Sequence, residues 1–234
     1  MLKAIPHIIT SMNLLCGVLA ILALGEGRYI DSAYLIFLAG LLDFFDGFAA
    51  RLLKVSGEFG KQLDSLADVV TFGVVPGLML FFLIGDLENW PFSKNTMPLI
   101  RYTALLIPVF SAIRLAKFNI DTKQSNSFIG VPTPANAFWI ASIPFLFRDF
   151  PEILSQSWVN PYSLAVLSAL SAALLVSPIE LFSLKLNSYT LSAAWPQYVF
   201  LLVMLISLIL FKFAALFGLV PIYLIVSLIV NRKK

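Results

Sequence analysis

The stretch DFFDGFAARLLKVSGEFGKQLDSLAD, residues 43–68, contains four aspartates and lies between long apolar segments. The four are Asp43, Asp46, Asp64 and Asp68. On translocon scales an aspartate at the centre of a membrane helix costs about 2.5–3.5 kcal/mol, and less near an interface. The few cations nearby in sequence cannot pair with each of the four carboxylates. We therefore expect this stretch to carry function, with something other than side-chain cations balancing its charge.

Composition indicates that the apolar segments cross a membrane. Of 234 residues, 59% are hydrophobic and 12% are charged, whereas soluble domains usually contain about 25% charged residues. The apolar runs have about 17–22 residues, and a helix needs roughly 20 to cross a bilayer. We predict an all-α polytopic membrane protein, one domain over residues 1–234, whose helices after residue 150 are less distinctive. Eight spans are expected at residues 8–25, 30–53, 63–85, 98–118, 134–149, 159–177, 195–211 and 213–231.

The basic residues predict the orientation. With eight spans, both termini and the loops after the second, fourth and sixth helices share one side, which carries eleven of the sixteen Lys and Arg residues. The positive-inside rule makes this side cytoplasmic. We therefore expect an integral protein of the cytoplasmic (inner) membrane, with both termini cytoplasmic and the aspartates at the cytoplasmic end of the second and third helices.

Other residue counts exclude some kinds of site. The single cysteine, Cys16, permits no intrachain disulfide, and the single histidine, His7, rules out a histidine-based metal centre. The net charge of +3 is modest and sits at membrane edges, and no nucleic-acid-binding pattern is present.

The spacing of the aspartates predicts a metal site. Asp43 and Asp46 are three residues apart, and Asp64 and Asp68 are four apart, so each pair lies on one face of its helix. Two antiparallel helices can then direct all four carboxylates into one pocket, where their mutual repulsion requires cations. An all-oxygen site favours Mg²⁺, Mn²⁺ or Ca²⁺. Two ions about 3.5–4 Å apart would suit a displacement at phosphorus.

Small residues flank the aspartates. Gly47 and Ala50 clear one side of the second helix, and Gly60 clears the start of the third. They would let a nucleotide or diphosphate approach the backbone closely. Small residues at such spacing also serve helix packing in membranes, but beside four aspartates we favour the ligand role.

The stretch resembles a known family. It fills every fixed position of D-x2-D-G-x2-A-R-x8-G-x3-D-x3-D, the signature of the CDP-alcohol phosphotransferases. The flanking segments 5–17, 63–76, 114–119 and 128–136 are similar to those of the integral-membrane phosphatidylserine synthases within that family. Two residues depart from the group: His7 stands where asparagine is common, and Asn136 where a small residue is common. The resemblance covers roughly residues 1–145.

The resemblance implies an activity: transfer of the phosphatidyl group of CDP-diacylglycerol to the hydroxyl of L-serine, with release of CMP. It implies that all four aspartates bind two divalent ions, Mg²⁺ or Mn²⁺, and that Asp68 is also the general base. Arg51 would contact the diphosphate, and a homodimer is expected. The other residues expected to bind the CDP-lipid are Asn13, Gly47, Ala50 and Gly60, although Asn13 could equally make a packing contact.

We expect residues of the fourth helix and of the loop that follows it to bind serine. Arg114 is the first candidate for the serine carboxylate, because a guanidinium offers a bidentate fork. Lys117, Asn119 and Thr133 are secondary candidates. Arg114 and Lys117 could instead reach from the helix to the cytoplasmic interface.

Three alternatives stay open. The nearest is a member of the same family that acts on glycerol phosphate, inositol phosphate or choline. A membrane prenyltransferase also binds diphosphate through aspartate-rich helices, but it usually has two acidic clusters on separate hairpins. A cation transporter would place such residues near the midplane and often has a related second half.

Overall fold

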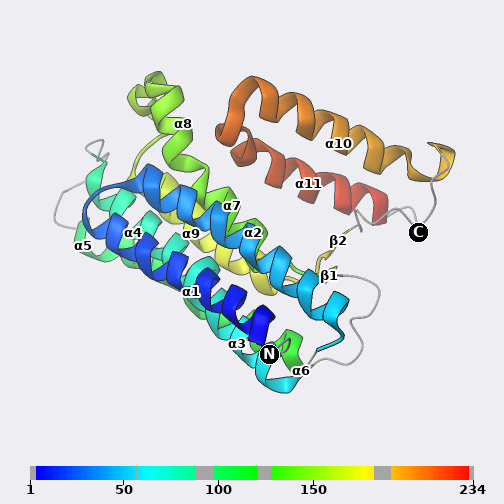
Figure 1. The fold of residues 1–234 in the computed structure, drawn as a ribbon. Coiled ribbons are helices and arrows are strands. Elements are labelled where there is room, and N and C mark those ends of the chain that lie inside the picture. Colours follow the sequence, from blue (N-terminus) through cyan, green and yellow to red (C-terminus); the bar gives the residue numbers. More distant parts are fainter. Residues whose placement is uncertain (1–3, 56, 88–96, 121–127, 182–190, 232–234) are drawn as a thin grey trace.

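The computed structural model describes residues 4–55, 57–87, 97–120, 128–181 and 191–231, and almost all of this part is helical (Figure 1). The main helices are α1 (Ala4–Gly25), α2 (Tyr29–Leu53), α3 (Glu58–Asp68), α4 (Val75–Asp86), α6 (Leu106–Ile120), α7 (Thr133–Ala141), α8 (Ile143–Asp149), α9 (Pro161–Val176), α10 (Leu191–Phe211) and α11 (Ala215–Asn231). The shorter elements are a π-helix, η1 (Val69–Val74), α5 (Met97–Ile100), the 3₁₀ helices η3 (Arg101–Leu105), η4 (Pro151–Ser155) and η5 (Lys212–Ala214), and two strands, β1 (Phe128–Ile129) and β2 (Glu180–Leu181).

Within the described residues, five helical stretches are long and apolar enough to cross a membrane. They are Ala4–Gly25, Tyr29–Leu53, Glu58–Asp86, Arg101–Ile120 and Val199–Leu228. The first four match the first four predicted spans, and the all-α membrane fold is confirmed. The apolar helix Pro161–Val176, at the sixth predicted span, is shorter than these. The count of eight spans stays a prediction.

The last apolar stretch changes direction at Lys212, as the sequence predicted. Lys212 adopts a left-handed backbone conformation, with φ of 49°, between α10 and α11. Figure 1 shows these helices side by side and antiparallel, and Trp139 Nε1 of α7 donates to the Phe217 carbonyl of α11 at 3.0 Å.

The fifth predicted span, residues 134–149, is not one continuous helix. It is divided at Ser142 into α7, with nine residues, and α8, with seven. Pro144 in the first turn of α8 has no backbone N–H and does not continue the hydrogen-bond ladder of α7. At about 1.5 Å per residue, neither part is long enough to cross a bilayer core alone.

The third span, α3–η1–α4, lies at the centre of the bundle. Its most apolar window is 67% buried, against 39% or less for the other four stretches. Two glycines let α6 approach it closely. A Cβ atom on Gly73 would lie 3.0 Å from the Ser111 Cβ, and one on Gly77 would lie 2.7 Å from the Pro108 Cδ. The helix that carries Asp64 and Asp68 is thus fixed from several sides.

The start of α7 is anchored by the short strand pair. β1 and β2 are antiparallel, with Ile129 opposite Glu180. Gly130 follows with φ of 72°, and its N–H donates to the Ile179 carbonyl at 2.9 Å. A Cβ atom at Gly130 would lie 2.6 Å from the Leu175 carbonyl oxygen, so only glycine fits at this position. This contact brings Thr133 to the bundle.

Candidate active site

The four aspartates lie where α2 and α3 meet the first turns of α1. The N-terminal end of α1, the start of α3 and the end of α6 are found at one end of the bundle (Figure 1). α2 ends at Leu53, because Lys54 turns left-handed with φ of 53° and its N–H returns to the Ala50 and Arg51 carbonyls. This turn reverses the chain within a few residues, so that the two aspartate pairs face each other.

Three of the aspartates form a compact group. Asp43, Asp64 and Asp68 each offer a carboxylate oxygen, and these oxygens all lie within 4.8 Å of one another. Asp68 is 7% exposed, and Asp64 Oδ1 is buried without a hydrogen-bond partner among the described residues. Carboxylates this close, with Asp68 buried and the other two partly buried, repel one another strongly unless a cation lies between them. A hard divalent cation fits this all-oxygen donor set.

Asp46 stands beside this group and has a partner from α1. Thr10 Oγ1 donates to Asp46 Oδ2 at 2.7 Å, and both side chains are buried. One turn further on, Asn13 Nδ2 donates to Asp68 Oδ1 at 3.5 Å. The structure thus brings all four predicted aspartates to one place, with Asp46 close enough to the other three to interact with them electrostatically.

A cavity of about 490 Å³ opens next to the aspartates. It is lined by Pro6, His7, Thr10, Asp46, Gly47, Ala50, Val55, Gly57, Glu58, Gly60, Lys61 and Asp64. The three predicted small residues are all in this wall. A Cβ atom on Gly47 would meet nothing within 4 Å, whereas one on Gly60 would lie 3.0 Å from the His7 Cε1.

Two residues predicted to bind the CDP-lipid do not line this cavity. Asn13 is fully buried against Asp68, and Arg51 is exposed near the end of α2. Conversely, sequence reasoning did not place Thr10 or Lys61 in the site, and it left the role of His7 open. His7 packs edge-to-face on Phe59, with ring centroids 5.2 Å apart. Thr10 could have been found as a polar residue one turn before Asn13, on the same face of a largely apolar helix.

The residues predicted to bind serine divide into two groups. Arg114 Nη1 donates to Thr133 Oγ1 at 3.4 Å, and its guanidinium interacts electrostatically with Asp68. Arg114 Nε is buried without a hydrogen-bond partner in the described part of the chain. These two residues therefore border the aspartate group, with a donor available for a ligand.

The second group lies at the end of α6. Asn119 Nδ2 donates to Ser65 Oγ at 2.8 Å, and the Asn119 backbone carbonyl accepts from Lys61 Nζ at 2.7 Å. Lys117 is exposed. Asn119 thus joins α6 to α3, beside the aspartates and not among them.

Asn136, whose role the sequence left open, is fully buried on the same face of α7 as Thr133. Neither its Oδ1 nor its Nδ2 has a hydrogen-bond partner among the residues that the structure describes.

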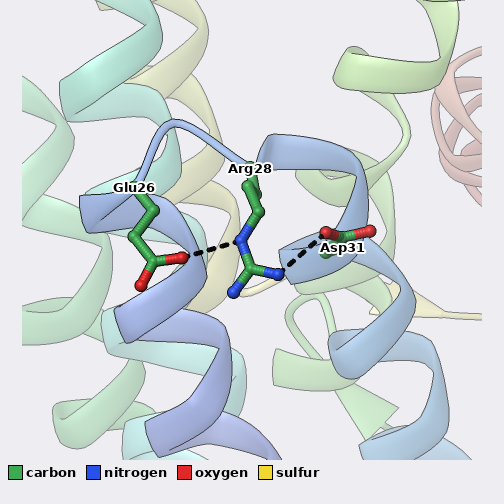
Figure 2. Close-up of polar contacts among 3 residues, drawn as sticks. All are labelled: Glu26, Arg28 and Asp31. Atoms are coloured by element: carbon green, nitrogen blue, oxygen red, sulfur yellow. Dashed lines mark hydrogen bonds and ion pairs between the residues drawn. The ribbon is translucent and has the colours of Figure 1, made fainter.

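The α1–α2 turn, far from the aspartates, has a different electrostatic arrangement. Figure 2 shows the Arg28 guanidinium between two carboxylates, with Nε 2.9 Å from Glu26 Oε2 and Nη1 3.4 Å from Asp31 Oδ2. All three side chains are more than half exposed. Exposed ion pairs of this kind contribute at most about 1 kcal/mol, and here each carboxylate already has its cation. This contrast identifies the unpaired group on α2 and α3 as the candidate active site.

Comparison with known proteins identifies the family. A sequence model of the family described as CDP-alcohol phosphatidyltransferase matches residues 3–230. A Bacillus subtilis protein named CDP-diacylglycerol–serine O-phosphatidyltransferase is 34% identical over 177 residues, which cover 75% of this chain and 88% of the relative. A Helicobacter pylori protein of the same name is 37% identical over 134 residues, which are 56% of this chain and 53% of the relative. A Methanothermobacter thermautotrophicus protein named archaetidylserine synthase is 31% identical over 163 residues, covering 67% and 63% of the two chains. The chain thus spans about half the length of the Helicobacter relative.

Proposed function

The chain belongs to the CDP-alcohol phosphatidyltransferase family, and from this premise we propose that it transfers the phosphatidyl group of CDP-diacylglycerol to L-serine. The products are phosphatidylserine and CMP. The observation that carries the proposal is the group of three carboxylates within 4.8 Å beside a cavity of about 490 Å³. The names of the relatives support serine as the acceptor.

The aspartates hold divalent metal in this proposal. The family generally depends on a divalent metal, and the acidic group supplies oxygen ligands for it. Asp43, Asp64 and Asp68 would be ligands within the group, and Asp46 a fourth ligand beside it. With Mg²⁺ or Mn²⁺ held there, and two ions as the expected number, charge on the diphosphate would be neutralised and CMP would become a better leaving group.

The cavity receives the CDP portion of the lipid. Gly47 and Gly60 leave backbone exposed on two of its walls, and Ala50 adds only a methyl group. Arg51, exposed near the end of α2, would contact the diphosphate. The diacylglycerol chains then extend into the bilayer along apolar helix surfaces.

Asp68 accepts the proton of the serine hydroxyl. The hydroxyl oxygen forms a bond to the lipid-side phosphorus while the bond from this phosphorus to the bridging oxygen breaks, and CMP leaves with that oxygen. A carboxylate is a weak base for an alcohol, so the proton moves to Asp68 as the new O–P bond forms. Asp68 lies next to Asn13 and in the field of Arg114.

Serine is held on the α6–α7 side of the aspartates. Arg114 binds the serine carboxylate with its unpaired Nε and an Nη, since a planar guanidinium matches a carboxylate. Thr133, 3.4 Å from Arg114, is the next contact. Lys117 and Asn119 act from further away, through charge and through the position of α3.

The finer placement of the protein is also proposed. The basic residues at the aspartate end of the bundle support a location in the cytoplasmic membrane with both termini cytoplasmic. The homodimer is supported by the family resemblance. Cysteine substitutions at Ala4 and Gly25, the first and last residues of α1, would report orientation through labelling from one side of sealed vesicles. Labelling of Ala4→Cys from the outside of intact cells would contradict it.

A panel of acceptors tests the activity. The purified protein is incubated with CDP-diacylglycerol, Mn²⁺ and, in separate reactions, serine, glycerol phosphate, inositol phosphate or choline, and CMP is measured. We expect CMP release with serine alone. Release with another acceptor would identify a different member of the family. A prenyltransferase or a cation transporter would release no CMP with any acceptor, and the proposal would then be wrong.

A further inference from the structure

Helix α1 contributes two polar side chains to a face that is otherwise apolar or small. Its buried face includes Pro6, Thr10, Asn13 and Gly17, which recur about once per turn. Thr10 is 4% exposed and Asn13 is not exposed. Because buried polar groups are costly without partners, their partners should indicate why they are here.

Both side chains donate to aspartates of the active site. Thr10 Oγ1 lies 2.7 Å from Asp46 Oδ2, and Asn13 Nδ2 lies 3.5 Å from Asp68 Oδ1. Each donor meets the second aspartate of its pair, one on α2 and one on α3. Two residues one turn apart on α1 thus connect both helices that carry the metal site.

The position of α1 against α3–η1 is itself fixed. Thr71 Oγ1, in the π-helix directly after Asp68, donates to the Asn13 backbone carbonyl at 3.2 Å. Gly17 lies against Thr71 so closely that an added Cβ atom would overlap its hydroxyl. Asn13 therefore cannot move along α1 without breaking the contact with Thr71.

The two hydrogen bonds differ in geometry. The Thr10 hydroxyl has one proton and two acceptors, Asp46 at 2.7 Å and the Pro6 carbonyl at 3.0 Å. The Asn13 bond is at the long end of the range, and Asn13 Oδ1 has no partner among the described residues. Hydrogen bonds of this kind in ligand-free sites often tighten only when the substrate is bound.

We propose that Thr10 and Asn13 are positioning residues: Thr10 orients Asp46 for metal binding, and Asn13 orients Asp68 for proton transfer. Neither needs to touch the substrate. A carboxylate with one oxygen held by a donor presents its other oxygen in a defined direction, as outer hydrogen bonds do at many metal sites. The inference rests on the proposed function for the role of Asp68, but the role of Thr10 concerns metal binding alone.

The role of Thr10 is tested by metal binding, without catalysis. Mn²⁺ binding to the purified, substrate-free protein is measured by electron paramagnetic resonance for the unsubstituted chain and for Thr10→Val, Thr10→Ser and Ser11→Ala. Thr10→Val keeps the shape and removes the donor, and we expect Mn²⁺ affinity to fall about 10- to 100-fold. Thr10→Ser restores the donor and should restore affinity. Ser11 is exposed, and its hydroxyl donates to the His7 carbonyl of the same helix at 2.8 Å, so Ser11→Ala controls for loss of a helix hydroxyl.

The role of Asn13 is tested by measuring steady-state kinetics and thermal stability together. We expect Asn13→Leu to lower kcat about 10- to 100-fold, while KM for CDP-diacylglycerol and the thermal unfolding temperature stay near those of the unsubstituted protein. Asn13→Ser, which keeps a shorter donor, should recover part of kcat.

Two outcomes overturn the inference. One is Mn²⁺ affinity in Thr10→Val equal to that in Ser11→Ala. The other is a loss of kcat in Asn13→Leu that is matched by lower stability or by a higher KM, and that Asn13→Ser does not recover. If the unsubstituted protein released no CMP with any acceptor, the proposed function would fail, and the Mn²⁺ series would still decide the role of Thr10.

Discussion

Replacing Gly47 with alanine should affect stability and substrate binding in opposite directions. Gly47 lies within α2 and in the wall of the cavity of about 490 Å³. A Cβ atom there would meet no atom within 4 Å. The substitution therefore adds a methyl group to open space without a clash in the ligand-free protein.

The two magnitudes follow from this geometry. Glycine inside a helix is less stable than alanine by roughly 0.5–1 kcal/mol, so Gly47→Ala should raise the free energy of unfolding by about that amount. If the CDP portion packs on the Gly47 backbone, the methyl group overfills the contact and costs about 1–3 kcal/mol of binding. KM for CDP-diacylglycerol should then rise about 5- to 150-fold.

The assay combines thermal unfolding in detergent with steady-state CMP release at varied CDP-diacylglycerol. Gly25→Ala is the matched control, because an added Cβ atom there also meets nothing within 4 Å. Gly25 is the last residue of α1 and does not line the cavity. Gly25→Ala should leave KM unchanged. A Gly47→Ala protein with unchanged KM would refute the placement of the nucleotide in this cavity.

Three further predictions follow from the same contacts. Removal of divalent metal with a chelator should abolish CMP release, and added Mg²⁺ or Mn²⁺ should restore it; activity that persists in chelator would contradict the role of the acidic group. Gly40→Ala should lower the free energy of unfolding by about 1–3 kcal/mol, because an added Cβ atom overlaps the Phe138 ring; an unchanged unfolding temperature would show that this ring moves aside. Arg114→Ala should raise KM for serine more than Lys117→Ala does, since Arg114 lies against Thr133 whereas Lys117 is exposed; lower kcat with unchanged serine KM would exclude the carboxylate role.

The grouping of the aspartates could be predicted from the sequence because it depends on spacings within one short stretch, residues 43–68. The spacings of Asp43 with Asp46 and of Asp64 with Asp68 place each pair on one helix face, and the short connection between α2 and α3 leaves little freedom in how the two faces meet. Two glycines of the cavity wall, Gly47 and Gly60, were predictable for the same reason, whereas Gly57 was not predicted. The first four spans were predictable because their apolar runs are long and end at polar residues.

Contacts between distant segments could not be predicted in this way. Nothing in the sequence places Thr10 against Asp46 or Asn13 against Asp68, because these contacts depend on how α1 rotates and slides against two other helices. The break at Ser142 was missed because the prediction used hydropathy, which does not show that Pro144 lacks the backbone N–H needed to continue the helix. The contact between Arg114 and Thr133 depends on how α7 lies against α6, and the two-residue strands β1 and β2 that anchor the start of α7 give no sequence signal.

One measurement tests the central claim most directly: transfer of labelled serine into lipid by the purified chain, with CMP measured in the same reaction, for the unsubstituted protein and for Asp64→Asn. Asp64 belongs to the carboxylate group, and its Oδ1 has no hydrogen-bond partner in the described part of the chain. We predict phosphatidylserine and CMP in equal amounts with Mn²⁺, and loss of both in Asp64→Asn. CMP release without label in the lipid, or equal labelling by the Asp64→Asn protein, would contradict the account.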